Sequence, residues 1–147
     1  MKKVLLFALV LAAAYFGGIE TGIVPGGPDD VVQSQSVDNL DLEAAFRNRQ
    51  SDIQIRGSGR VIRVLRDDME GSRHQRFILD VGSGQTLLIA HNIDLAERIS
   101  SLKTGDRIEF FGEYEWNPQG GVLHWTHLDP QKRHLSGWLK HNGNIYQ

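Results

Sequence analysis

Histidines gather near the C-terminal end of the chain, in the stretch GGVLHWTHLDPQKRHLSGWLKHNG at residues 120–143. This stretch holds four of the six histidines and two of the three tryptophans. Imidazole is the most common metal ligand among side chains, and its charge changes near neutral pH. The stretch therefore fits a metal site, a binding surface, or the last strand of a small barrel.

Four of these side chains form a predicted metal set, namely His124, His127, Asp129 and His134. His124 and His127 are three residues apart, so a regular strand would point them to opposite faces. The proline after Asp129 favours an end to the strand, which would let the set converge. Three imidazoles and one carboxylate suit Zn²⁺ or another divalent metal. No standard zinc motif such as HExxH is matched, so an ordinary surface stays open as the alternative.

A predicted hairpin around the Asn-Pro-Gln-Gly turn places a carboxylate beside one of these imidazoles. Counting outward from the turn pairs Glu113 with His124. Because side chains alternate between faces, Leu123 and Trp125 should share the buried face. Glu113, Glu115 and His124 should share the opposite face. Glu113 is therefore predicted to support the metal set by orienting His124, or else to form an exposed pair of little energetic value.

A second candidate site, for a ligand, lies near the ends of two predicted strands. It comprises Arg73, His74, Gln75, Arg76, His91 and Asn92. Arginine side chains bind phosphate and carboxylate groups through paired N–H donors. If His74, His91 and His127 meet at one mouth of a barrel, beside a helix N-terminus, that mouth would favour anions. Acidic residues nearby in the sequence offer the alternative of a mixed-charge surface.

The elements that must position these residues are mostly strands. Alternating apolar and polar residues predict five strands, at residues 52–68, 76–81, 85–90, 107–116 and 121–127. A helix is predicted between the third and fourth strands, at residues 93–102, because Leu95, Ile99 and Leu102 form an apolar stripe. A short helix is predicted before the strands, at residues 41–48. This order predicts a mainly β fold, a five-stranded OB-like barrel, with an antiparallel sandwich as the alternative.

Composition narrows the function classes. The chain has 147 residues and a net charge of −2, so it has no basic field that would recruit nucleic acid. Cysteine is absent, which excludes disulfides, a thiol nucleophile and cysteine-bound zinc.

The first residues have the layout of a bacterial secretory signal. Lys2 and Lys3 precede an apolar run, and small residues follow at a plausible cleavage point. Residues 1–19 are predicted to be a signal peptide or a membrane anchor, residues 20–37 a linker, and residues 38–147 the OB-like domain. The predicted location is periplasmic or exported, with residues 4–19 anchoring the chain in the inner membrane if they are not removed.

Several segments resemble an uncharacterised family of small exported bacterial proteins. They are GSRHQRF at 71–77, AHNIDLAERI at 90–99 and GEYEWNPQGGVLHWTHLDP at 112–130, followed by His134 and Gly137-Trp138. The resemblance covers roughly residues 40–147. It implies an OB-like barrel in the bacterial envelope. It suggests no particular activity, because the family is catalogued only as a domain of unknown function.

Two functions follow as expectations. The first is an exported OB-type binding module of the cell envelope, with an unresolved ligand or protein partner. The alternative is a small metal-dependent hydrolase that acts on phosphodiesters through its histidine and aspartate cluster. No nucleophile motif, phosphate loop or dinucleotide fingerprint is present. The near-neutral charge and the unmatched metal spacing favour the binding module.

Overall fold

The computed structural model describes residues 39–147. The elements are, in chain order, α1 (Leu40–Arg47), β1 (Ile53–Val64), β2 (His74–Asp80), β3 (Thr86–Asn92), β4 (Arg107–Glu115), β5 (Val122–His124), β6 (Trp138–His141) and β7 (Asn144–Tyr146). The predicted signal peptide or anchor and the linker lie outside the described residues. Within residues 39–147, no helix is long and apolar enough to cross a membrane.

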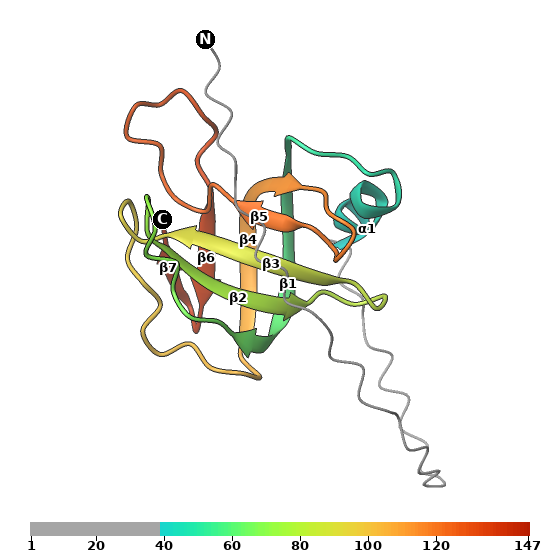
Figure 1. Ribbon diagram of the computed structural model, residues 1–147, viewed down its shortest axis with the longest axis horizontal. Helices are drawn as coiled ribbons and strands as arrows, with labels where there is room; N and C mark the ends of the chain where they lie inside the picture. Colours follow the sequence, from blue (N-terminus) through green and yellow to red (C-terminus); the bar gives the residue numbers. More distant parts are fainter. Residues whose placement is uncertain (1–38) are drawn as a thin grey trace, which may run out of the picture. The chain divides into compact units, whose positions relative to one another are not determined.

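Strands β1 to β5 close a barrel in the order β1-β2-β3-β5-β4, and β4 returns to pair with β1 (Figure 1). β1 serves two partners, because residues 53–60 pair with β4 and residues 60–64 pair with β2. The register shifts between Val61 and Arg63, just after the strand changes partner. The neighbouring strands are antiparallel except for β3 and β5, which are parallel. The prediction of a mainly β fold is confirmed, as a closed five-stranded barrel.

Alternate residues of each strand fill the interior of the barrel. The fully buried side chains include Phe77, Leu79, Leu87, Ile89, Ile108, Phe110, Tyr114 and Leu123. Leu42 and Ala45 of α1 join the same apolar core. The intervening residues of β4 and β5 face outward, so one face of these strands is free to carry polar groups.

Gly57 of β1 makes room for side-chain hydrogen bonds that join the residue before α1 to β1. The Asn39 side chain accepts a hydrogen bond from the Ser58 N–H and donates to the carbonyls of Ser58 and Val81. A Cβ on Gly57 would lie 2.5 Å from the Asn39 side-chain oxygen and 2.7 Å from the Phe110 ring. Gly57 therefore allows close packing of the start of α1 against β1.

The prediction of a helix at residues 93–102 is wrong, because this segment forms turns and α1 precedes all the strands. The Gln75 side chain accepts from the Ile99 N–H and donates to the Ile99 carbonyl, at 2.9 Å each. His91 Nε2 lies 3.0 Å from the Glu97 carbonyl oxygen. These buried side chains bind backbone groups that a helix would use itself. Of the predicted apolar stripe, Ile99 is fully buried, whereas Leu95 is exposed, so the three side chains do not share one buried face.

β6 and β7 add a hairpin to the barrel that the sequence did not predict. β4 pairs with β1 along one edge and with β5 and then β6 along the other. The chain between β5 and β6, residues 125–137, forms a long loop (Figure 1, red-orange). We call it the β5–β6 loop, and it carries the rest of the predicted metal set.

Candidate metal centre

β4 and β5 bring two acidic residues and one imidazole to the outer face of the barrel. Glu113 and Glu115 project outward, while Tyr114 between them is fully buried. Glu113 pairs with His124, and Tyr114 pairs with Leu123, as the hairpin count predicted. The expected placement of Glu113, Glu115 and His124 on one face is confirmed.

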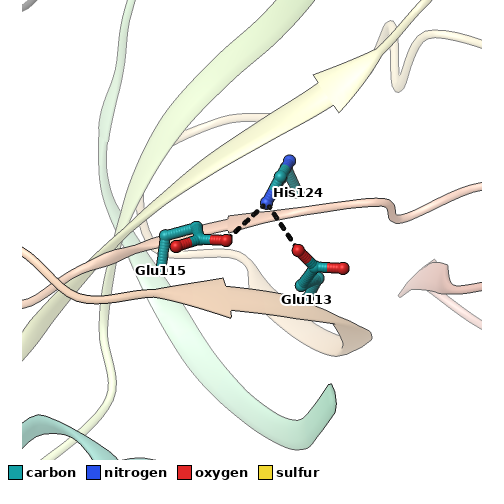
Figure 2. A group of neighbouring side chains, drawn as sticks. All are labelled: Glu113, Glu115 and His124. Atoms are coloured by element: carbon teal, nitrogen blue, oxygen red, sulfur yellow. Dashed lines mark ion pairs between the residues drawn. The ribbon is translucent and has the colours of Figure 1, made fainter. Parts of the chain in front are cut away.

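The three outward side chains point toward one another, as Figure 2 shows. His124 Nε2 lies 3.6 Å from a Glu113 carboxylate oxygen and 3.7 Å from a Glu115 carboxylate oxygen. These separations are too long for hydrogen bonds, and the buried Nε2 atom has no hydrogen-bond partner in the part of the chain that the structure describes. Ligand atoms about 2 Å from one tetrahedral zinc ion are themselves about 3.3 Å apart. The spacing is therefore close to that of a metal site.

His134 joins these three residues from the β5–β6 loop. Its Nε2 contacts the second carboxylate oxygen of Glu113, and its Nδ1 lies 2.7 Å from the Leu135 carbonyl oxygen. Because a carbonyl only accepts, Nδ1 carries a proton, and the neutral ring then has its lone pair on Nε2. The direct contact between Nε2 and the carboxylate leaves no room for an ion between them, so the two groups are hydrogen-bonded. His134 therefore orients the Glu113 carboxylate from the loop side.

We call Glu113, Glu115, His124 and His134 the Glu/His cluster. Of the predicted metal set, the structure brings His124 and His134 together beside Glu113. Sequence reasoning did not include Glu115 in that set, although strand alternation placed it on the correct face. His127 is buried outside the cluster, with Nδ1 2.7 Å from the Leu128 carbonyl oxygen.

The remaining member of the predicted set, Asp129, shapes the β5–β6 loop. Its carboxylate accepts hydrogen bonds from the backbone N–H groups of Gln131, Arg133 and His134, at 2.7 to 2.9 Å. Gly137 closes the loop through a bond from its N–H to the His127 carbonyl. Asp129 therefore positions His134 and is itself occupied by backbone donors.

The prediction that Trp125 packs in the core is wrong. β5 ends at His124, and Trp125 has a φ of 55°, which interrupts the alternation of side chains. Trp125 is half-buried and stacks on the His134 ring, with centroids 3.9 Å apart and planes 9° from parallel. Thr126 is buried in its place, and its hydroxyl lies 2.8 Å from His91 Nδ1.

We expect Trp125→Ala to lower the free energy of unfolding by only about 1–2 kcal/mol, because its ring is half-buried. Leu123→Ala should cost more, about 3–4 kcal/mol, because it removes a fully buried side chain. Urea unfolding of both variants and the wild type in metal-free buffer measures the difference. An equal or larger loss for Trp125→Ala would contradict its outward placement.

The electrostatics of the cluster favour a cation. Burial and, to a smaller extent, the neighbouring carboxyl groups of Asp52 and Glu113 together raise the pKa of Glu115 to about 7. Burial lowers the pKa of His124, against the opposing effect of Glu113. A neutral imidazole is the form that binds metal. Carboxylates crowded around it repel one another until a positive charge is supplied.

Because the Glu115 carboxylate lies among other carboxylates, we expect Glu115→Gln to stabilise the metal-free protein above neutral pH. The folded-state pKa of Glu115 lies above its ordinary value of 4.5, so stability is lost as pH rises from about 4.5 through about 7. Because the side chain is partly exposed, we expect a gain of only about 0.5–1 kcal/mol at pH 8. Urea unfolding at pH 5 and pH 8 measures it. A variant less stable than the wild type at pH 8 would refute the prediction.

A family model described as "Protein of unknown function (DUF3465)" matches residues 30–147. The chain belongs to this family. No curated protein matches the chain. The match covers the whole described barrel, and it confirms the resemblance to an uncharacterised family. The description of DUF3465 assigns no activity, so function must be argued from the cluster itself.

The arginines of the second predicted site in this DUF3465 chain have partners within the chain. Arg73 Nε lies 2.6 Å from an Asp94 carboxylate oxygen. The Arg76 guanidinium donates to the Arg66 carbonyl at 3.1 Å. The Asn92 side-chain oxygen accepts from the Asp94 N–H. Through these contacts, the three residues fix the conformation of neighbouring loops.

The other members of that site lie at one end of the DUF3465 barrel. Gln75 and His91 are paired on adjacent strands and are buried. Burial lowers the pKa of His91 to about 4, and the imidazoles of His127 and His74 also lower it. His91 is turned inward and bonded on both ring nitrogens, to the Thr126 hydroxyl and the Glu97 carbonyl.

Proposed function

We propose that this protein is an OB-type binding module of the bacterial envelope that holds one divalent cation, best suited to Zn²⁺, in the Glu/His cluster. The observation that carries the proposal is the buried Nε2 of His124. It has no hydrogen-bond partner among residues 39–147 and faces the carboxylates of Glu113 and Glu115 at 3.6 and 3.7 Å. Imidazole nitrogen and carboxylate oxygen are both zinc ligands, and these three side chains leave the fourth tetrahedral position open to an external ligand.

The arrangement of the strands supports the OB-type assignment. A long first strand shared between β2 and β4, and a parallel β3–β5 pair, close a five-stranded barrel. OB barrels commonly bind ligands on an outer face and its adjoining loops. The Glu/His cluster lies on β4, β5 and the β5–β6 loop, so the proposed metal site rests on the cluster's own geometry and not on the usual binding face of the fold. Lys2, Lys3 and the apolar run after them support export to the periplasm or beyond.

Binding is favoured over the alternative of metal-dependent hydrolysis. Enzyme sites are usually concave and largely preformed. Two pockets of the described surface lie beside α1, and they are lined by residues such as Glu43, Phe46, Ser83 and Gln85. These pockets share no residue with the Glu/His cluster, which lies on an outer face of the barrel.

The full chain should bind one Zn²⁺ per molecule at pH 7.5, and the melting temperature should rise with zinc and fall again with EDTA. Isothermal titration calorimetry gives the stoichiometry. His127→Gln is the informative comparison, because the sequence predicted His127 as a ligand and the structure places it outside the cluster. We expect it to retain zinc. Failure of the wild type to bind zinc saturably would contradict the proposal.

A further inference from the structure

Beside the Glu/His cluster, on the same outer face, Arg56 lies over two aromatic rings. Arg56 of β1 pairs with Phe111 of β4, which pairs with Trp138 of β6. The Arg56 guanidinium carbon lies 5.8 Å from the Phe111 ring centroid and 5.5 Å from the Trp138 ring centroid. Attraction between a guanidinium and aromatic faces restricts where this side chain can go. The charge is therefore held at a defined place on the face.

Within the described barrel, the Arg56 guanidinium has no acidic partner. Across residues 39–147, Arg56 forms no ion pair, whereas Arg73 and Arg98 are each bound by an aspartate. It also donates no hydrogen bond to the described part of the chain, although a guanidinium carries five N–H donors. An exposed, positioned and unpaired guanidinium is suited to an external anion.

Strand geometry places this guanidinium close to the Glu/His cluster. Gln54 pairs with Glu113 in one row across the sheet, and Arg56 pairs with Phe111 in another. The two rows are two residues apart along the strands, which is a distance of about 7 Å. The Gln54 side-chain oxygen is buried and has no hydrogen-bond partner among the described residues, like His124 Nε2 in the same row. Two such atoms on either side of Glu113 are a second sign that this row binds a species from outside the chain.

We infer that Arg56 and the cation of the Glu/His cluster together bind a phosphate group, either free phosphate or a phosphate ester. This inference rests on the proposed metal site. A metal–oxygen bond of about 2 Å and a charge-assisted hydrogen bond of about 2.8 Å, with the tetrahedral anion between them, span the separation of the rows. Phosphate offers oxygens to both cations at once, and its double charge matches them better than a carboxylate does.

Equilibrium dialysis of the zinc-loaded full chain against labelled inorganic phosphate tests the inference, because zinc and phosphate per protein are measured in the same sample. We expect Arg56→Gln to keep its zinc and to bind phosphate at least about tenfold more weakly. Arg63→Gln, an exposed arginine of the same strand, is the matched control and should bind both like the wild type.

Three results would overturn the inference, and they can be told apart. If Arg56→Gln keeps its zinc and binds phosphate like the wild type, the phosphate site is refuted and the metal site stands. If the wild type binds no zinc, the proposed function fails, and the phosphate site fails with it. If equimolar acetate displaces the phosphate, the site binds carboxylates and the assignment of phosphate is wrong.

Discussion

Glu113→Gln should weaken zinc binding at pH 7.5 by about 100-fold or more. Glu113 is the one residue of the Glu/His cluster that reaches both imidazoles, through its two carboxylate oxygens. The amide keeps the shape of the side chain and removes its charge, so the variant loses a ligand and the group that orients His134. Loss of a supporting partner alone typically costs 10- to 100-fold in metal affinity. Competition with a chromophoric chelator measures the change.

Glu109→Gln is the matched control for that experiment. Glu109 lies on the same strand and face, four residues from Glu113, and is exposed. It should bind zinc like the wild type. If both variants lose zinc to the same extent, the general negative charge of β4 binds the ion. If neither variant loses zinc, Glu113 is no ligand and the cluster does not hold the metal.

Acid should destabilise the protein through His91. Its pKa in the folded state is about 4, against an ordinary value of 6.5, because burial opposes the charged ring. The unfolded chain therefore takes up this proton first. The contribution of His91 is fully present above pH 6.5 and is lost as pH falls through about 4. Each pH unit between 6.5 and 4 lowers the free energy of unfolding by about 1.4 kcal/mol, so the total loss is about 3 kcal/mol.

His91→Gln isolates this effect from other titrating groups. Glu115 acts in the opposite direction over part of the same range, because its pKa is raised. We expect the variant to be less stable than the wild type at pH 7, since the contact with Thr126 is lost. Between pH 6.5 and pH 4, the variant should lose about 3 kcal/mol less unfolding free energy than the wild type loses. Parallel curves of unfolding free energy against pH would refute the role given to His91.

The β4–β5 hairpin could be predicted from the sequence because it depends on local rules. A tight turn sets the register, and strand alternation then places Glu113, Glu115 and His124 on one face. The same rules failed one residue beyond His124. Trp125 adopts a positive φ, a conformation that non-glycine residues seldom take, and nothing in the local pattern signals it.

The missed features depend on contacts between distant residues. The segment 93–102 has the apolar stripe of a helix, but Gln75 and His91 bind its backbone from neighbouring strands. His134 reaches Glu113 because Asp129 folds the β5–β6 loop through three backbone bonds. A single sequence shows the residue types in these contacts, but it does not show which groups meet.

The most direct test of the metal centre is a crystal structure of the zinc-loaded protein, with anomalous data collected above and below the zinc absorption edge. We expect one strong zinc peak per chain, bound by His124 and by carboxylate oxygens of Glu113 and Glu115. A strong peak at His127 or His74 with none at the cluster would contradict the proposed site. So would the absence of any zinc peak at the cluster in crystals grown with excess zinc.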